Sequence, residues 1–533
     1  MDEYDVVVLG TGAAGLTAAL TAASEGATVG LFEKADRIGG TTALSGGVVW
    51  LPDNRYAAAA GVADDRERAL TYLHALSNGS MLPEMVEAFV DGVAPLLDWL
   101  ERETPLRLKL VSRYPDYHPE HPGGLPGGGR SLEPELVDTR GLGGWRDRLV
   151  GTPRRLYISE IPSGGGTGVI APDLMERRTA GSLEGLGRGL VAALLKGCLD
   201  LSVEPGTGMR AVDLMIEDDR VTGVRLESAS GLREVRASKA VIIATGGFEY
   251  APELVRDFLH GPVAHPPGVP TNTGDGLRMA MRLGAALGVM HEAWWVPVVL
   301  VPAADGTAAP TLLLRERTLP GTLMVNSRGR RFTNEAANYN ALGATFRAFD
   351  INSYSYANVP AWLILDDACV RKYGVFGTAP GSGAPDWVSR ADTLEGLAEL
   401  IGVPAAELIA TVERFNGHVA AGHDPDFRRG ESVYDGWCGD QAHYGTPHAT
   451  LGGVTTGPFY AIRVHPSTLG TKGGPRTTPT GQVMRADGGA VTGLYAVGNA
   501  MAAPTGMVYG GAGGTLGPAM VFGHLAGRHA AAH

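Results

Sequence analysis

The sequence predicts an α/β fold in which one parallel-sheet domain is split across both chain ends and an α+β domain is inserted between its parts. A strand–helix–strand pattern opens the chain, and glycine-rich motifs recur near residue 245 and again from residue 466 onward. After about residue 299 proline and glycine interrupt the sequence with irregular stretches, and helical periodicity returns from Leu394 to His418. We therefore expect a first part at 1–298, the inserted domain at 299–465 and a C-terminal part at 466–533.

The N-terminal unit is a βαβ motif. Asp5-Val6-Val7-Val8-Leu9 is a continuous apolar run, as a strand buried on both faces of a parallel sheet requires. A helix is predicted from Gly15 to Ser24, followed by a second strand from Thr28 to Phe32.

A second group of strands is predicted in the middle of the chain. Residues 210–238 have the alternation of an antiparallel meander with a turn near Asp218, and Ala240 to Ala244 forms another buried strand. Trp294 to Leu300 fits either the wall of an apolar pocket or a core strand between the domains. The stretch from Pro302 to Gly306 is expected to be irregular.

Composition excludes several classes of protein. A formal net charge of −12, without a dense Lys/Arg run, argues against nucleic-acid binding. The acidic start from Met1 to Asp5 is unlike a signal peptide, and Trp294 to Pro302 is too short to span a bilayer. Three widely spaced cysteines favour a reducing compartment without disulfides or zinc: Cys198, Cys369 and Cys438. We expect a cytoplasmic protein with no integral membrane segment.

A dinucleotide site is predicted at the first turn. Gly10-Thr11-Gly12-Ala13-Ala14-Gly15 fits the GxGxxG fingerprint, follows a strand and opens a helix. The glycines let a pyrophosphate approach the helix N-terminus, where unpaired N–H groups favour negative charge. Glu33, at the end of the next strand, is placed to accept hydrogen bonds from ribose hydroxyls.

Three further motifs indicate FAD. Residues 37–47, the Ala244-Thr245-Gly246-Gly247 turn, and Gly498-Asn499 followed by 513–517 resemble fumarate reductase–like flavoproteins in type and order. The resemblance implies a Rossmann-type FAD-binding domain, with FAD held non-covalently because residues 39–47 contain no histidine. The expected cofactor contacts are Gly10, Gly12, Ala13, Ala14, Gly15, Glu33, Lys34, Gly39, Gly40, Thr41, Thr42, Ser45, Gly46, Gly47, Ala244, Thr245, Gly246, Asp275, Gly498, Asn499, Gly514, Thr515 and Leu516.

Along nearly its whole length the chain resembles the 3-ketosteroid Δ1-dehydrogenases. The matching stretches are 50–52, 115–117, 334–339, 469–474 and 509–513. The resemblance implies that Tyr339 is the base that removes the C2 proton, assisted by Tyr117, while the hydride from C1 goes to flavin N5. It also implies that the Tyr509 hydroxyl and the Gly513 N–H hold the ketone oxygen of a 3-ketosteroid.

A tyrosine pair suits this chemistry. Free tyrosine has a pKa of about 10 and is mostly protonated at neutral pH. A second hydroxyl that donates to the phenolate, or a helix dipole, is expected to lower the pKa of Tyr339. Tyr114 competes with Tyr117 for the helper role.

Three alternatives stay open. A fumarate reductase–like dicarboxylate enzyme shares residues 330–335 but has an arginine where this chain has Tyr339. A 3-ketosteroid Δ4-(5α)-dehydrogenase would desaturate another ring position, and the spacing from Tyr509 to Gly513 favours the Δ1 type. A non-catalytic FAD-binding protein would lack the tyrosine set.

Other partners are less defined by the sequence. His260 with His265, and His443 with His448, lack partners at metal-ligand spacing, so no metal is expected. The expected reaction requires an electron acceptor, and a quinone is one candidate. Loose association with a membrane is a second open question, because the expected substrate is apolar. Residues 130–168 carry no clear motif, and their role is not predicted.

Overall fold

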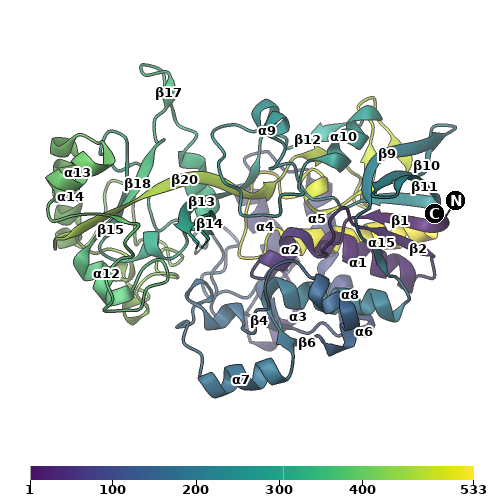
Figure 1. The fold of residues 1–533 in the computed structure, drawn as a ribbon, viewed down its shortest axis with the longest axis horizontal. Coiled ribbons are helices and arrows are strands. Elements are labelled where there is room, and N and C mark those ends of the chain that lie inside the picture. The colour runs from purple at the N-terminus through teal and green to yellow at the C-terminus, as the bar shows by residue number, and fades with distance from the viewer. Residues whose placement is uncertain (1, 304) are drawn as a thin grey trace.

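The computed structural model describes residues 2–303 and 305–533, so Met1 and Ala304, in two of the stretches discussed above, lie outside the described residues. The chain forms two lobes (Figure 1). One lobe contains both termini, and the other is built from the middle of the chain. The split α/β architecture expected from the sequence is confirmed.

An eight-stranded sheet organises the first lobe. Its main order is β22-β23-β11-β1-β2-β8, and the pairs β23–β11, β11–β1, β1–β2 and β2–β8 are parallel. The bounds are β1 Asp2–Leu9, β2 Val29–Phe32, β8 Pro205–Gly206, β11 Gly231–Ile243, β22 Gln482–Met484 and β23 Ala490–Ala496. The chain ends therefore meet in one sheet, because β23 follows the inserted lobe and still pairs beside β11.

The predicted βαβ unit and meander are present. Helix α1 spans Ala13–Ser24 between β1 and β2, and the hairpin of β9 (Arg210–Glu217) and β10 (Arg220–Ser228) continues into β11. Strand β11 is longer than expected, because the third meander strand and the buried run at 240–244 form one continuous strand. Its buried C-terminal half lies between β1 and β23.

Helices cover this sheet closely. Helix α15 (Leu516–Ala532) packs along α1. A Cβ at Gly523 would lie 2.7 Å from the Ala14 carbonyl oxygen, and one at Gly527 would lie 2.5 Å from that of Ala18. These two glycines, one turn apart, let the two backbones approach each other, which fixes the C-terminal helix beside the first turn of α1.

The inserted lobe is built on a six-stranded antiparallel sheet of order β14-β13-β20-β18-β15, with β19 also paired to β20. The bounds are β13 Ala293–Pro302, β14 Ala308–Leu312, β15 Thr322–Asn326, β18 Ala361–Asp366, β19 Ser389–Ala391 and β20 Phe459–Thr471. Both expected domain boundaries fall inside strands, since β13 and β20 run across them. The two lobes are thus joined by a pair of hydrogen-bonded strands.

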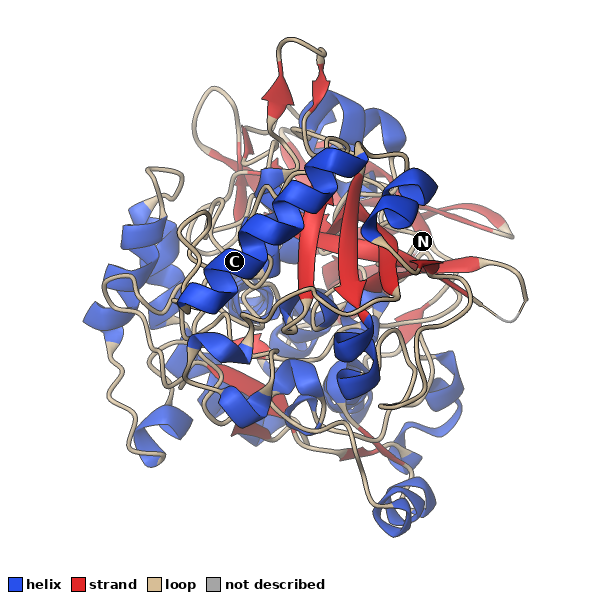
Figure 2. Ribbon diagram, turned by 90° about the vertical axis from the view of Figure 1, so that its left-hand side faces the viewer, coloured by secondary structure: helices blue, strands red, loops and turns tan. Residues whose placement is uncertain are grey.

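The helical periodicity at 394–418 corresponds to α13 (Leu394–Ile401) and α14 (Ala405–Ala421). Their apolar side chains pack with those of the sheet in one cluster, in which Leu408 and Phe415 are fully buried. Figure 2, which views this lobe end-on, shows helices lying across its strands. Gly402 separates the two helices in the left-handed conformation that ends a helix.

The remaining elements surround these two sheets. They are α2 Gly40–Leu44, β3 Val49–Trp50, α3 Arg55–Ala59, α4 Arg66–Leu76, α5 Pro83–Asp91, α6 Val93–Glu103, β4 Leu108–Leu110, β5 Ser131–Pro134, β6 Val137–Asp138, α7 Pro172–Ala180, β7 Leu183–Glu184, α8 Leu186–Asp200, α9 Pro252–Phe258, α10 Asp275–Arg282, β12 Leu287–Gly288, α11 Tyr339–Thr345, β16 Phe349–Asp350, β17 Ser355–Tyr356, α12 Asp367–Tyr373 and β21 Gly474–Pro475. None of the helices in the described part of the chain is long and apolar enough to cross a membrane.

Candidate active site

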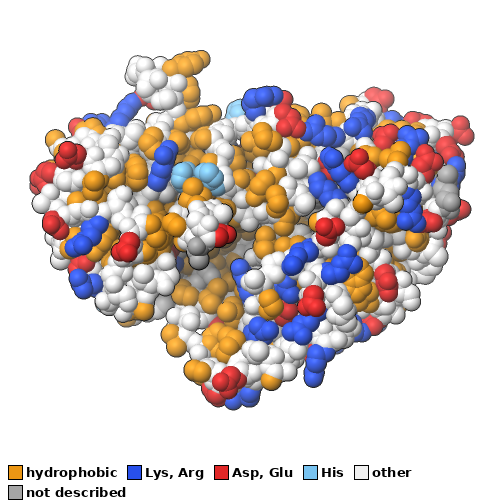
Figure 3. All heavy atoms as spheres, in the orientation of Figure 1, with side chains coloured by type: hydrophobic (Ala, Val, Ile, Leu, Met, Phe, Trp, Pro, Cys, Tyr) orange, Lys and Arg blue, Asp and Glu red, His pale blue; other side chains and the backbone are white. Residues whose placement is uncertain are grey.

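A single elongated cavity contains both groups of residues that the sequence singles out. Its volume is about 670 Å³, and its wall includes Gly10 and Glu33 as well as Tyr117, Tyr339 and Tyr509. The molecular surface is hollowed between the two lobes, with hydrophobic side chains in the hollow (Figure 3). A dinucleotide at one end and a substrate at the other would therefore share one enclosure.

The first turn has the geometry that a pyrophosphate requires. Gly10 has φ +110°, and a Cβ there would lie 2.3 Å from the Ala244 carbonyl oxygen; a Cβ at Gly15 would lie 2.0 Å from the Gly10 carbonyl oxygen. The N-cap residue of α1, Gly12, has no side chain, and the Ala13 N–H donates to the Thr42 hydroxyl. The N–H groups of Ala14 and Gly15 have no side-chain acceptor among the described residues, and such a helix end favours an anion.

Charged residues beside this turn are held in place by their neighbours. The Glu33 carboxylate accepts hydrogen bonds from the Thr11 N–H at 3.1 Å and the Thr11 hydroxyl at 2.7 Å. Lys34 pairs with Asp275 at 2.9 Å, and Arg210 pairs with the same carboxylate at 2.9 Å. These cations hold the pKa of Asp275 below its usual value although burial opposes them.

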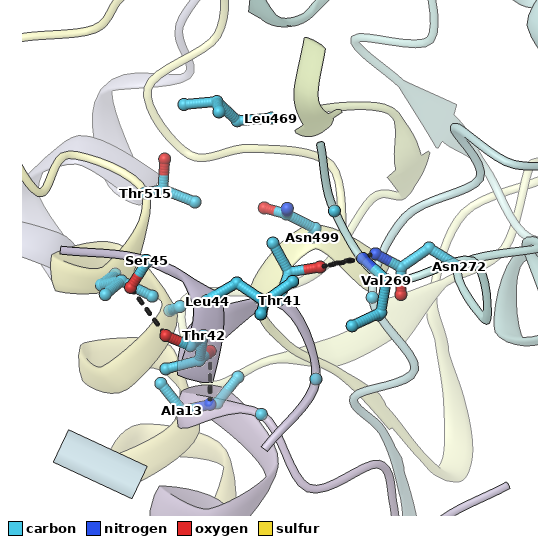
Figure 4. Close-up of a pocket in the computed structure, with 18 of the residues that line it drawn as sticks. Ala13, Thr41, Thr42, Leu44, Ser45, Val269, Asn272, Leu469, Asn499 and Thr515 are labelled. Carbon is cyan, nitrogen blue, oxygen red and sulfur yellow. Dashed lines mark hydrogen bonds between the residues drawn. The ribbon is translucent and has the colours of Figure 1, made fainter. Parts of the chain in front are cut away.

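The loop predicted to lie beside the flavin forms the middle of the cavity (Figure 4). The Thr42 hydroxyl accepts from the Ala13 N–H at 3.1 Å, so the loop is tied to the start of α1. The Thr41 hydroxyl accepts from the Val269 N–H and from the Asn272 amide, each at 3.2 Å. The loop is therefore fixed on both sides.

Most of the residues expected to contact the cofactor line this cavity. Those that do are Gly10, Gly12, Ala13, Ala14, Glu33, Lys34, Gly40, Thr41, Thr42, Ser45, Gly46, Gly47, Ala244, Thr245, Gly246, Asp275, Gly498, Asn499, Thr515 and Leu516. Gly15, Gly39 and Gly514 do not line it. They are closely packed against other residues: a Cβ would lie 3.0 Å from Val191 at Gly39, and 2.8 Å from the Tyr509 ring at Gly514.

The chemistry of this wall fits FAD. One end offers the N-terminus of α1 and an adjacent carboxylate, as a pyrophosphate and a ribose require. The middle offers hydroxyl, amide and backbone groups from Thr41, Ser45 and Asn499, which suit the polar edge of a flavin ring.

Three tyrosines lie in hydrogen-bonding contact at the other end. The Tyr117 hydroxyl donates to that of Tyr339 at 2.8 Å, which donates to that of Tyr509 at 3.0 Å. All three side chains are buried, and each ring packs against the other two. Residues 117, 339 and 509 thus converge on one point, as the sequence motifs suggested.

The expected lowering of the pKa of Tyr339 is not observed. Its pKa is raised well above the ordinary value, chiefly by burial and next by the neighbouring Tyr509, while the hydrogen bond from Tyr117 acts in the lowering direction. The sequence reasoning identified the sign of the Tyr117 contribution but underestimated the cost of burying a phenolate. The pKa of Tyr117 is also raised, again mainly by burial.

Tyr509 and Gly513 present donors to the cavity. The Tyr509 hydroxyl accepts from Tyr339 and, at 3.3 Å, from Thr515, so its own proton is left to donate elsewhere. Among the described residues none accepts a hydrogen bond from the Gly513 N–H. Gly513 has φ +94°, and a Cβ there would lie 2.5 Å from the Val48 carbonyl oxygen. A side chain is therefore excluded at this position.

A buried lysine contacts the residues that pack against Tyr509. The Lys472 ammonium donates to the Val508 carbonyl at 2.9 Å and lies 4.0 Å from the centre of the Trp294 ring. That ring packs edge-on against Tyr509 at 4.8 Å, and its N–H donates to Asn499 at 3.0 Å. Burial lowers the pKa of Lys472 to about 7. Trp294 thus belongs to the core strand β13 rather than to the pocket wall.

Helix α11 sets the position of Tyr339, its first residue. Asn338 caps the helix by accepting from the Ala341 N–H at 2.9 Å, and its amide donates to the Tyr117 carbonyl at 3.2 Å. The helix is pressed against β13, since a Cβ at Gly343 would lie 2.4 Å from that of Trp295. The backbones of both predicted acid–base residues are therefore linked through one asparagine.

Tyr114 is the alternative to Tyr117 for the helper role. It lines the cavity and packs against Trp437 at 4.7 Å between ring centres. Burial raises the pKa of Tyr114 well above its ordinary value, and a hydrogen bond with Tyr117 opposes this. Its hydrogen bond is with Tyr117, and no hydrogen bond or ring contact joins it to Tyr339 among the described residues.

A buried carboxyl group lies behind the flavin-side loop. Glu249 is 5% exposed; one oxygen accepts from the Asn272 amide at 2.6 Å, and the other has no hydrogen-bond partner among the described residues. Burial raises the pKa of Glu249 to about 7. Sequence reasoning missed this residue, which lies three positions beyond the turn at Gly246.

Several residues of the cavity wall were missed as well. Strand β14 and the turn after it, for which no prediction was made, contribute Pro310, Thr311, Leu312 and Leu314. The segment without a motif contributes Arg154, Ile158 and Ser163. An apolar run at 312–314 was the available signal for the first group, and no motif marked the second.

Comparison with known proteins agrees with this geometry. The family model described as FAD binding domain matches residues 5–516. A 4-oxocyclohexanecarboxylate 2-dehydrogenase of Sinomonas cyclohexanicum is 41% identical over 98% of this chain and 92% of its own length. A 3-oxosteroid 1-dehydrogenase of Mycobacterium tuberculosis is 38% identical over 100% of this chain and 99% of its own.

A solved structure shares the whole architecture. The 3-ketosteroid Δ1-dehydrogenase of Sterolibacterium denitrificans, solved with 1,4-androstadiene-3,17-dione, has a TM-score of 0.92 and 34% identity, with 100% of both chains covered. The prediction of FAD is confirmed, as is the resemblance drawn from the motifs.

Proposed function

The chain belongs to the FAD-binding family that includes the 3-oxosteroid 1-dehydrogenases, and from that premise we propose that it desaturates the ring of a 3-ketosteroid between C1 and C2. The observation that carries the proposal is the contact of Tyr117, Tyr339 and Tyr509 at the end of the FAD cavity. Desaturation next to a ketone needs a base for the adjacent proton and donors for the developing enolate oxygen. The site contains both.

The hydrogen bonds support a role for each of these residues. Tyr509, with its proton free to donate, and the Gly513 N–H bind the ketone oxygen and stabilise the charge that develops on it. Tyr339 removes the C2 proton, and Tyr117 donates to the resulting phenolate. Bound FAD supplies the two-electron acceptor for the hydride from C1.

The raised pKa of Tyr339 has a mechanistic consequence. A free phenolate is rare in the buried site, so Tyr339 must lose its proton before it acts as a base. The hydrogen bond from Tyr117 favours the phenolate of Tyr339 and so assists this loss.

Non-covalent attachment of FAD is part of the proposal. Residues 39–47 contain no histidine, and Thr41, Thr42 and Ser45 offer only hydroxyl groups to the cavity. Denaturation with acid should release all the FAD into the supernatant. Yellow colour retained by the precipitated chain would show a covalent bond.

A dicarboxylate substrate is less well supported. Such a substrate needs cations at both ends. The end of the cavity where we place the ketone is instead formed by the uncharged Tyr509, Gly513 and Thr515. The position four residues beyond Glu335 is Tyr339, which lies within the tyrosine contact. Product analysis distinguishes desaturation between C1 and C2 from desaturation between C4 and C5.

An exposed surface feature leads us to propose a quinone acceptor and loose association with a membrane. The hairpin of β16 and β17 projects from the inserted lobe (Figure 1) and carries Ile351 at 81% and Tyr354 at 84% exposure. An exposed apolar tip suits contact with a lipid surface, where quinones dissolve. Co-sedimentation with vesicles, lost in the Ile351→Asp variant, would support this contact.

The test of the reaction is anaerobic. The holoenzyme is mixed with 4-androstene-3,17-dione, and flavin absorbance and products are followed. Bleaching with formation of 1,4-androstadiene-3,17-dione is expected. Flavin that stays oxidised with 3-ketosteroids but responds to fumarate or succinate would contradict the proposal.

A further inference from the structure

The segment without a motif forms one edge of the substrate end of the cavity. Ile158 packs with the tyrosines in one apolar cluster, and the Ser163 carbonyl accepts from the Trp437 indole at 3.1 Å. Both residues line the cavity. Arg154, four residues before Ile158, lines it as well and is exposed to solvent, so it lies where the cavity opens.

Arg154 differs from the other charged residues of the wall. Glu33 is held by Thr11, and Lys34 is paired with Asp275, all beside the dinucleotide turn. The Arg154 guanidinium makes one long hydrogen bond, to the Leu44 carbonyl at 3.4 Å, and no ion pair with any described residue. A chain of net charge −12 therefore keeps an uncompensated cation at this opening.

Neither acidic side chain of the described wall is free to pair with this cation, because Glu33 accepts from Thr11 and Asp275 pairs with Lys34 and Arg210. Beside the tyrosines, the wall is formed by apolar side chains such as Leu312, Leu314 and Leu469. A neutral substrate would leave the guanidinium hydrated and unused. A carboxylate instead forms charge-assisted, two-pronged hydrogen bonds with a guanidinium, stronger than those between neutral groups.

We propose that Arg154 binds a carboxylate carried by the substrate at the end of the molecule remote from the ketone. This inference rests on the proposed function, since Tyr509 and Gly513 must hold the ketone. Two substrate sources share the chemistry: a small cyclic keto acid, such as the compound for which the Sinomonas relative is named, and a 3-ketosteroid whose side chain ends in a carboxylate.

The experiment compares each acid with its methyl ester, which has the same ring but no charge. Wild-type holoenzyme, Arg154→Gln, Arg154→Lys and the control Arg177→Gln are assayed with 4-oxocyclohexanecarboxylate, with a 3-ketosteroid acid and with both esters. Arg177 suits the control because it is an exposed arginine on α7, paired with Asp173, and does not line the cavity.

We expect Arg154→Gln to raise KM for the favoured acid roughly 10-fold or more, as loss of a charge-assisted pair predicts. KM for its ester and kcat should stay near the wild-type values, Arg154→Lys should restore part of the affinity, and Arg177→Gln should change nothing. The acid that shows the effect identifies the source. Added salt should weaken binding of that acid in the wild type only.

The outcomes separate the two proposals. If acid and ester are turned over with the same KM in wild type and in Arg154→Gln, the inference is overturned and the desaturation stands. If no ketone, including 4-androstene-3,17-dione, bleaches the flavin, the proposed function fails and the inference fails with it.

Discussion

At the scale of single residues, the site is decided by what burial does to hydroxyl and carboxyl groups. Tyr117, Tyr339 and Tyr509 are buried together, so the loss of hydration is the main influence on their protonation and their mutual interactions come next. The sequence identified these three through motif matches. It could not supply the balance of desolvation against hydrogen bonding, because that balance depends on which rings from distant segments pack around them.

Removal of the helper hydroxyl should shift the pH dependence of catalysis. Tyr117→Phe deletes the donor that favours the Tyr339 phenolate, so the pKa of Tyr339 rises further. We expect a loss of roughly 10²-fold in flavin reduction, the low end for a group that assists proton transfer. The rise of the rate with pH should move to higher pH. An unchanged pH profile would exclude Tyr117 as the helper.

Glu249 should leave a signature in stability. Its pKa is raised from 4.5 to about 7, so the folded protein binds a proton that the unfolded chain has released. Stability from this group is full below about pH 4.5 and falls as pH rises through 7, by about 3 kcal/mol in total. Glu249→Gln should flatten this part of the pH dependence of Tm between pH 5 and 8. A difference between variant and wild type that is independent of pH would count against the buried neutral carboxyl.

At the scale of elements, strands β1 and β2 and helix α1 could be predicted from the sequence. Helix α11, which begins at Tyr339, could not. β1, α1 and β2 follow from a buried apolar run and glycine spacing, both local signals. Helix α11 is a single short stretch at 339–345 that contains a glycine, and it is stabilised by its contact with β13. Strand β14 was not predicted, and it pairs with β13 across the stretch at Pro302 to Gly306 that was expected to be irregular.

The contact of α11 with β13 gives a test with a matched control. In Gly343→Ala the new Cβ would lie 2.4 Å from that of Trp295, and overpacking of this kind costs about 1–3 kcal/mol. We expect the displaced helix to slow flavin reduction while FAD stays bound. Gly417→Ala, in α14, meets nothing within 4 Å and should stabilise the protein by about 0.5–1 kcal/mol. Equal activity in both variants would contradict the positioning role of α11.

At the scale of the whole molecule, the cofactor cavity is built from both ends of the chain. The turn at Gly10, the strand β11 and the loop at Gly498 meet only because β23 joins the sheet beside β11. The order of the glycine motifs along the sequence predicted this closure. The expected domain boundaries lie within β13 and β20, which pair with each other and continue from one lobe into the other.

FAD should therefore stabilise the chain as one unit. Binding to the folded state alone adds about 2.7 kcal/mol when free FAD is at 100 times its Kd. We expect removal of FAD to lower Tm, and added FAD to restore it with a single unfolding transition. ADP, which lacks the flavin, should restore less. Two separate transitions, of which FAD shifts only one, would show that the lobes unfold independently.

The most direct test of the central claim is the rate of flavin reduction in Tyr339→Phe. Holoenzyme is mixed anaerobically with 4-androstene-3,17-dione in a stopped-flow instrument, with Tyr434→Phe as the control. Tyr434 packs against Tyr117 at 5.0 Å between ring centres but does not line the cavity. We expect the Tyr339→Phe rate to fall by about 10²–10⁴-fold, the usual contribution of a general base, with FAD and ketone still bound and the Tyr434→Phe rate close to that of the wild type. Bleaching of Tyr339→Phe at the wild-type rate would contradict the assignment of Tyr339 as the base.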